Sequence, residues 1–276
     1  MIRVYNGYGA SELAQQTIAQ RFNHHRIKAC SISAEKIKAS EFQKDTDILV
    51  FGGKSVTQFK QALGEQGLDA IKTYVENGGH YLGICAGGYF GAKQIDFVGR
   101  ETNGDLYTKQ AKGLGFFNGI AKGSLTEVAS PYTGTADSAE IMTIATHKDS
   151  IKYQTLYWGG PQFIPNNEHP KKDTRILSHF NTATGDNLIM GVQCDVGDKG
   201  GKATLLGYHP EVSDDNIKRW VLPSGHFNQH SQKLYERLHY STSADTYSVN
   251  AAFTFLLYQL GLRDEPQKKP HIEKSI

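Results

Sequence analysis

Short apolar runs alternate with stretches that carry apolar residues at helical spacing. The runs are rich in Ile, Val, Leu and aromatic residues and predict buried strands over residues 2–5, 27–32, 48–51 and 81–84. Ser11 is placed to cap a helix that runs to about residue 22, and a helical pattern over 68–76 precedes the fourth strand. This alternation predicts an α/β fold, with a mostly parallel sheet flanked by helices on both faces.

The pattern changes twice further along the chain. Glycines and short alternating runs between residues 91 and 173 predict inserted hairpins, and strands resume over 175–180, 188–194 and 202–208. Helical spacing then dominates, with an apolar stripe that ends at Gly261. We therefore expect an α/β domain over residues 1–212, C-terminal helices packed on the same domain over 213–263, and a charged tail over 264–276.

The turn after the fourth strand carries the clearest chemical signal. Gly83-Ile84-Cys85-Ala86-Gly87 is the cysteine form of the G-x-S-x-G nucleophile elbow. Such a turn exposes one side chain above the sheet at a helix N-terminus, which favours the negatively charged thiolate. The alternative is a small cysteine buried between packed glycines, but the strand–turn–helix context favours a nucleophile.

A base for this thiol is expected downstream. A thiolate nucleophile needs a base, and the base needs a group that orients it. His209-Pro210-Glu211 follows a predicted strand, and residues two apart in an extended segment point to the same side. Glu211 can therefore hold one ring nitrogen of His209 while the other faces Cys85.

The loops after the first and third strands are expected beside the elbow, because ligands bind beyond the carboxyl ends of parallel strands. Gly52-Gly53-Lys54-Ser55 lacks the spacing of a phosphate loop, so we interpret it as a tight turn whose backbone N–H groups face the site. Tyr157-Trp158-Gly159-Gly160 either walls a pocket or forms a packed turn, and the sequence leaves both open.

Composition narrows the possible functions. The 276 residues are 38% hydrophobic and 21% charged, as in an ordinary globular protein, and a net charge of +2 does not favour nucleic acid. Three widely spaced cysteines indicate neither a disulfide framework nor a zinc site. With no leader pattern and no run near the roughly 20 apolar residues of a membrane span, we expect a cytoplasmic protein. No metal, cofactor, nucleic acid or membrane is implied, and the oligomeric state is left open.

The elbow and the downstream His-Pro-Glu together resemble the class I glutamine amidotransferase-like superfamily. The resemblance implies a flavodoxin-like three-layer fold, with Cys85 as nucleophile, His209 as base and Glu211 as the residue that orients the base. It also implies an oxyanion hole formed by backbone N–H groups at Gly52, Gly53 and Ala86.

More narrowly, the stretches 4–11, 51–53, 74–90 and 157–160 resemble the N-terminal amidotransferase-like domain of eukaryotic-type biotin-protein ligases, over roughly residues 1–212. The sequence departs from the patterns of these families in two ways that bear on function. Tyr89 stands where glutamine amidotransferases usually carry a substrate-holding glutamine, which argues against glutamine as the substrate. The chain also lacks a biotinyl-adenylate loop and a ligase lysine motif, so it is not expected to ligate biotin by itself.

These observations favour a cysteine hydrolase or amidotransferase that acts on an amide or related acyl bond of a small-molecule or peptide-like substrate. The residues expected in its substrate pocket are Tyr8, Gly87, Tyr89, Tyr157 and Trp158. Two alternatives remain. One is a non-catalytic module that binds a metabolite or a partner, which Tyr89 favours, and the other is redox or carbonyl chemistry at the same thiolate.

Overall fold

The structure is a computed structural model that describes residues 1–146, 151–166, 173–213, 215–216, 229–240 and 246–264. Parts of the expected C-terminal helices and nearly all of the expected tail lie outside these residues. None of the described helices combines the length and the apolar character needed to cross a membrane.

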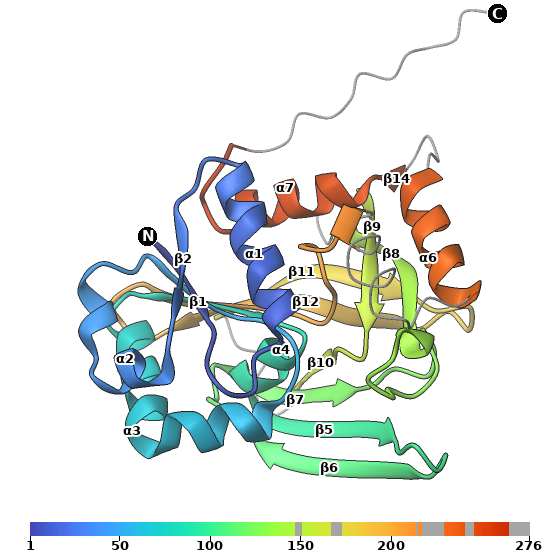
Figure 1. Cartoon of the computed structure of the whole chain (residues 1–276). Helices are drawn as coiled ribbons and strands as arrows, with labels where there is room; N and C mark the ends of the chain where they lie inside the picture. Colours follow the sequence, from blue (N-terminus) through green and yellow to red (C-terminus); the bar gives the residue numbers. More distant parts are fainter. Residues whose placement is uncertain (147–150, 167–172, 214, 217–228, 241–245, 265–276) are drawn as a thin grey trace, which may run out of the picture.

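The described residues form a ten-stranded sheet at the centre of the molecule (Figure 1). Its strands are β1 (Ile2–Tyr5), β2 (Ala29–Ile32), β3 (Ile48–Phe51), β4 (His80–Ile84), β8 (Ala139–Thr146), β9 (Lys152–Trp158), β11 (Thr174–Asn181), β12 (Asn187–Val196), β13 (Gly201–Leu206) and β14 (Thr246–Tyr247). They lie in the order β14-β9-β8-β11-β12-β13-β4-β3-β1-β2.

The expected α/β class is confirmed, and the sheet is partly antiparallel. The strands β13, β4, β3, β1 and β2 are parallel neighbours, whereas β9, β8, β11, β12 and β13 pair antiparallel. The antiparallel half arises because β11, β12 and β13 follow one another through short turns, which return the chain beside itself.

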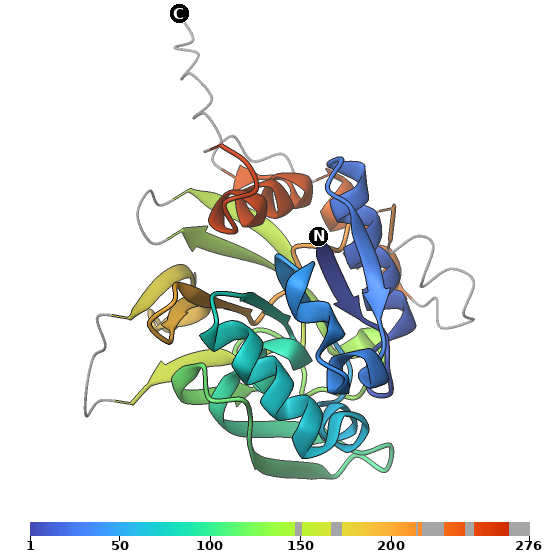
Figure 2. The same cartoon turned by 90° about the vertical axis from the view of Figure 1, so that its left-hand side faces the viewer.

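Helices cover both faces of the sheet and give it the expected three layers (Figure 2). They are α1 (Glu12–His24), α2 (Ala34–Lys38), α3 (Val56–Glu76), α4 (Ala86–Gly91), α6 (Gln229–Tyr240) and α7 (Val249–Gln259), with short 3-10 turns η1 (Glu41–Lys44) and η2 (Ala136–Ser138). Alternate residues of β3 divide between two cores. Leu49 and Phe51 pack with α2, α3 and α4, and Ile48 and Val50 pack with α1 and α7.

Part of the stretch expected to form hairpins after the elbow builds a second, four-stranded sheet, whereas β8 and β9 of the same stretch join the main sheet. The strands of the second sheet are β5 (Ala92–Arg100), β6 (Leu106–Lys112), β7 (Phe117–Gly123) and β10 (Gln162–Pro165), in the order β10-β7-β5-β6. This sheet lies below α4 in Figure 1, so that the long β5–β6 hairpin extends past the end of the elbow helix.

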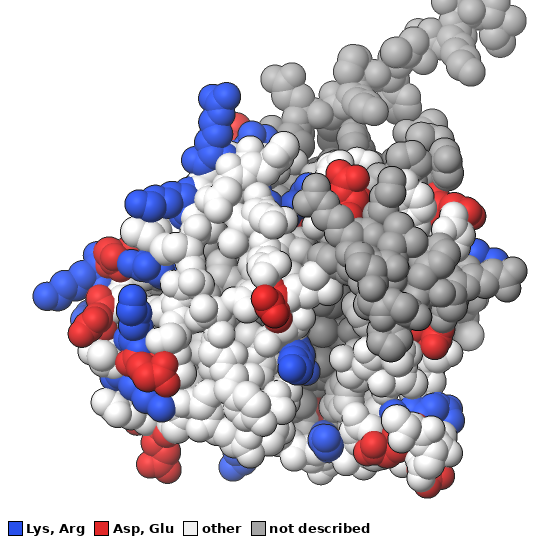
Figure 3. Space-filling model, viewed as in Figure 1, with Lys and Arg blue, Asp and Glu red and all other residues white. Residues whose placement is uncertain are grey.

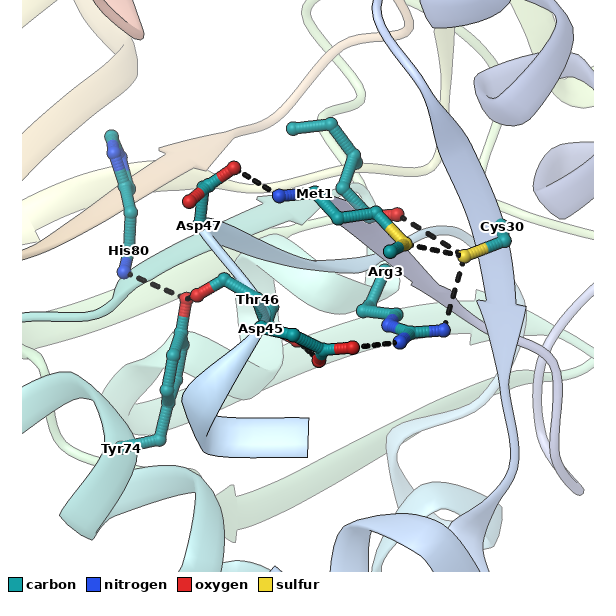
Figure 4. Close-up of polar contacts among 9 residues, drawn as sticks. Met1, Arg3, Cys30, Asp45, Thr46, Asp47, Tyr74 and His80 are labelled. Atoms are coloured by element: carbon teal, nitrogen blue, oxygen red, sulfur yellow. Dashed lines mark hydrogen bonds and ion pairs between the residues drawn. The ribbon is translucent and has the colours of Figure 1, made fainter. Parts of the chain in front are cut away.

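A polar network joins the amino ends of β1 to β4, at the edge of the sheet opposite the elbow (Figure 4). It involves Met1, Arg3, Cys30, Asp45, Thr46, Asp47, Tyr74 and His80. At one end of the network, the buried Tyr74 hydroxyl donates to the Thr46 carbonyl at 3.2 Å and accepts from the His80 backbone N–H at 3.2 Å. Cys30 belongs to this network and is therefore remote from the elbow thiol.

His80 is a structural residue of this edge. Burial, with a smaller contribution from the positive charge of Lys202, lowers the pKa of His80 to about 4. Its Nε2 lies 2.9 Å from the Thr204 hydroxyl. The ring is therefore neutral near pH 7 and serves as a hydrogen-bonding group between β4 and β13.

The substitution Tyr74→Phe is expected to destabilise the protein by about 1–3 kcal/mol, because it leaves the Thr46 carbonyl and the His80 N–H unpaired in the interior. Urea unfolding followed by circular dichroism measures the loss. Tyr8→Phe is the matched control. Tyr8 is 59% exposed, so the loss of its hydroxyl group should lower the free energy of unfolding by at most about 0.5 kcal/mol. Equal effects of the two substitutions would contradict this reading of the network.

Candidate active site

Cys85 is held in a strained turn between β4 and α4. Its backbone adopts φ 56° and ψ −108°, a conformation that L-residues avoid unless their surroundings impose it. The flanking glycines make this turn possible. A Cβ on Gly83 would lie 2.2 Å from the Gly87 carbonyl oxygen, and one on Gly87 would lie 2.0 Å from the Phe51 carbonyl oxygen. The G-x-C-x-G pattern therefore follows from close backbone packing.

His209 and Glu211 form a buried pair beyond the end of β13. His209 Nδ1 lies 2.8 Å from Glu211 Oε1, and the two side chains are 8% and 0% exposed. The backbone N–H of His209 donates to the Leu156 carbonyl of β9 at 2.8 Å, which fixes the segment. The structure thus brings together the two residues that the sequence pairs at positions i and i+2.

Cys85 and His209 border the same small space. A Cβ built on Gly53 would lie 3.6 Å from His209 Cε1 and 3.9 Å from Cys85 Sγ. His209 Nε2 is buried and has no hydrogen-bond partner among the described residues. Cys85 Sγ lies 3.5 Å from the Trp158 carbonyl oxygen, to which the thiol donates in this state. The second ring nitrogen of His209 is therefore left to exchange a proton with a group in this space.

The charges around His209 favour its protonated form. Burial of the ring opposes protonation, but the negative charge of Glu211, the neighbouring Cys85 side chain and the hydrogen bond between His209 and Glu211 outweigh it and hold the pKa of His209 well above its usual value. A histidine with a raised pKa that borders the same space as a thiol is able to share the proton of that thiol.

Backbone donors lie on both sides of the thiol. The N–H groups of Gly53 and Ala86 have no acceptor within the described parts of the chain, and both residues border cavities beside Cys85. The Gly52 carbonyl accepts from the Gly87 N–H at 3.0 Å and so anchors the elbow. The N–H groups of Gly53 and Ala86 are therefore the backbone donors beside the thiol that are left without a protein acceptor among the described residues.

Two cavities flank the thiol. The smaller one, of about 480 Å³, contains His209 and Glu211. The larger one, of about 620 Å³, lies between the first turns of α3 and the β5–β6 hairpin. Four residues border both cavities, namely Cys85, Lys54, Tyr132 and Trp158, so the Cys85 thiol lies where the two cavities meet.

The residues expected in the substrate pocket separate into two groups. Tyr89 and Trp158 line the larger cavity, whereas Tyr8, Gly87 and Tyr157 line neither cavity. The buried Tyr157 hydroxyl donates to the Gly160 carbonyl at 2.9 Å and accepts from the Leu125 N–H at 2.6 Å. Within this one stretch, Tyr157 packs the turn while Trp158 walls the pocket.

Other cavity residues were not expected from the sequence. Tyr132 and Lys109 come from inserted segments without a recognisable motif, and Lys60 follows the Gly-Gly turn by two helical turns. Ser55, which completes the Gly-Gly-Lys-Ser stretch, caps α3 by accepting from the Gln58 N–H at 3.4 Å. Across the described residues, no three His, Cys, Asp or Glu side chains converge as a metal site would require.

Comparisons with known proteins agree with this architecture. The family model for the N-terminal region of biotin-protein ligases matches residues 1–276. An uncharacterized protein of Chlamydia muridarum is 34% identical over 161 residues, which are 58% of this chain and 60% of that protein. The biotin–protein ligase of Schizosaccharomyces pombe is 25% identical over 217 residues, 77% of this chain but only 33% of the ligase. The matched part of this chain thus spans less than two thirds of either relative.

Among solved structures, a glutamine amidotransferase of Thermotoga maritima superposes with a TM-score of 0.51 at 14% identity, covering 94% of this chain and 96% of that chain. At this identity the likeness establishes the fold alone. The chain therefore belongs to the biotin-protein ligase N-terminal family, and its domain is built on the glutamine amidotransferase-like fold.

Proposed function

We propose that this protein is a cysteine hydrolase or amidotransferase that cleaves an amide or related acyl bond with a Cys85–His209–Glu211 triad. The observation that carries the proposal is the buried His209–Glu211 pair, whose second ring nitrogen borders the same space as the thiol of a strained elbow. A structural histidine would more commonly have both ring nitrogens paired in the interior.

In the proposed reaction, the Cys85 proton passes to His209 Nε2 and the thiolate attacks the substrate carbonyl carbon. The negative charge that develops on the carbonyl oxygen is received by the N–H groups of Gly53 and Ala86. Collapse of the tetrahedral intermediate breaks the C–N bond, and His209 gives its proton to the departing amine. Water, deprotonated by His209, then hydrolyses the thioester and releases the acid.

The substrate is not expected to be glutamine. Tyr89 replaces the substrate-holding glutamine of the superfamily, is only 4% exposed, and donates its hydroxyl to the Gly159 carbonyl at 3.1 Å. Its polar group is therefore already used and does not hold a substrate amide. We also do not propose biotin ligation for this chain alone, because the ligase motifs are absent from its sequence. The thiol chemistry requires a reduced Cys85, in keeping with the cytoplasmic location expected from the sequence.

A second candidate is a non-catalytic module that binds a metabolite or a partner. It is favoured by the contact in which the Cys85 thiol donates to the Trp158 carbonyl at 3.5 Å, and by the buried Tyr89 hydroxyl, which is bonded to the Gly159 carbonyl. In that case the elbow would be retained as architecture and the two cavities would only bind.

Incubation with p-nitrophenyl acetate distinguishes the proposed enzyme from the binding module. The proposed enzyme should release about one equivalent of p-nitrophenol in a burst and carry an acetyl group on Cys85, which peptide mass spectrometry detects. Cys85→Ala should lose the burst, whereas Cys30→Ala, with its thiol in the remote network, should keep it. Acylation of Cys85 no faster than that of a free cysteine would support the binding module.

A further inference from the structure

The larger cavity beside Cys85 carries charge of one sign. Among the described residues, the charged side chains that line it are Lys54, Lys60 and Lys109, and none is Asp or Glu. The outer surface is different, because acidic and basic side chains are interspersed on the side of α2 and α3 (Figure 3). The cavity is therefore more positive than the surface around it, whose formal charges nearly cancel over the whole chain at +2.

The three lysines enter the cavity from separate elements. Lys60 comes from α3 and donates to the Lys112 carbonyl at 3.2 Å, while the Lys109 ammonium group lies 4.7 Å from the centroid of the Tyr107 ring on β6. Lys54 follows the Gly-Gly turn with φ 137° and borders both cavities. Within the described residues, none of the three forms an ion pair with a carboxylate.

Positive groups that line a partly apolar recess concentrate anions there, because field lines focus in a low-dielectric cleft. The remaining wall supplies the apolar part, chiefly from Ile95, Phe97, Tyr107, Tyr132 and Trp158. A volume of about 620 Å³ is within the range of small-molecule sites. Cys85 lines the same recess as the lysines, so an anion bound there would be able to present a neighbouring carbonyl to the thiol.

We infer that the substrate is an anionic acyl compound. It presents an amide or related carbonyl at Cys85, places an apolar or planar segment against the aromatic wall, and carries a carboxylate or phosphate that Lys60 and Lys109 hold. This inference rests on the proposed function and deepens it, because it assigns the substrate class of the same site.

Two alkylating agents of opposite character test the inference without knowledge of the substrate. Iodoacetate is an anion and iodoacetamide is neutral, and both alkylate the same sulfur with loss of iodide, leaving a carboxymethyl and a carbamidomethyl group respectively. The rates are measured at Cys85 by peptide mass spectrometry, in the full chain and in a small neutral thiol, N-acetylcysteine amide. The ratio of the iodoacetate rate to the iodoacetamide rate should be higher at Cys85 than in the small thiol.

In the double variant Lys60→Gln/Lys109→Gln, this ratio should fall by about threefold or more, because two positive charges are removed from the cavity that Cys85 also lines. Raising the ionic strength should lower the wild-type ratio in the same direction. Lys36→Gln, which removes an exposed lysine on α2, should leave the ratio unchanged.

Two failures can be told apart. A wild-type iodoacetamide rate no higher than that of the small thiol would overturn the activated nucleophile, and with it the proposed function. A raised iodoacetamide rate with a ratio that is insensitive to the double substitution would overturn the anionic substrate alone. Carboxylate and phosphate compounds tested as competitors of iodoacetate then distinguish the two anionic groups by which of them protects Cys85.

Discussion

Replacing Gly87 with alanine is expected to destabilise the protein by more than about 3 kcal/mol, one of the largest effects of a single methyl group in this chain. The new Cβ would lie 2.0 Å from the Phe51 carbonyl oxygen and 2.7 Å from its carbonyl carbon. Phe51 ends β3, which pairs with β1 on one side and β4 on the other. The clash therefore falls on backbone in the middle of the sheet, which cannot yield as a side chain would.

Urea unfolding of Gly87→Ala beside Gly185→Ala tests this expectation. Gly185 has a φ of 92° but nothing within 4 Å of a built Cβ, so alanine there should cost only about 1–2 kcal/mol of backbone strain. If Gly87→Ala does not fold, Gly88→Ala gives the comparison, with its Cβ 2.6 Å from the Leu206 carbonyl oxygen. A loss at the elbow no greater than that at Gly185 would show that its glycines are not fixed by packing.

Replacing Glu211 with alanine is expected to cost about 3–5 kcal/mol, because it leaves the buried His209 without the partner of its charged form. Glu211→Gln keeps the shape and a hydrogen-bonding oxygen but removes the charge, so its loss should be smaller. Thermal or urea unfolding measures the stability of the three proteins, which should decrease in the order wild type, Glu211→Gln, Glu211→Ala.

The cost of Glu211→Gln should depend on pH. Because the pKa of His209 is raised, the stabilisation of its charged form is complete below the unfolded value of about 6.5 and is lost as the pH rises through the folded value. The difference in unfolding free energy between wild type and Glu211→Gln should therefore be larger at pH 6 than at pH 9. A difference that is equal at both values, or larger at pH 9, would contradict a charged pair.

The elements that the sequence predicts well are those with a local pattern. The strand Ile2–Tyr5, the Ser11 cap and the elbow at Cys85 each depend on neighbouring residues, and the structure has them where they were expected. The helix α3 begins earlier than the predicted stretch, because Gly64 interrupts it with φ 58° and ψ −175° and so hides its first half.

The cavity could not be predicted in the same way. One wall of the cavity depends on the pairing of β5 with both β6 and β7. These strands are distant in the sequence from the α3 residues that line the opposite wall. The lysines that give the cavity its charge are spread from residue 54 to residue 109 and share no motif. Sequence spacing identified the pair His209 and Glu211, since only Pro210 separates them, but it could not place Tyr132 beside Cys85.

The most direct test of the central claim is the rate at which iodoacetamide alkylates Cys85 between pH 5 and pH 9, in wild type, His209→Ala and His24→Ala. Peptide mass spectrometry assigns the modification to Cys85 and separates it from Cys30. His24 is exposed on α1, so its substitution is the matched control.

At pH 6 an unperturbed thiol is almost entirely protonated. If His209 holds the proton of Cys85, wild type and His24→Ala should react at that pH at least about tenfold faster than His209→Ala. Identical profiles for wild type and His209→Ala would contradict the activated thiolate and leave the binding module as the better account of this site.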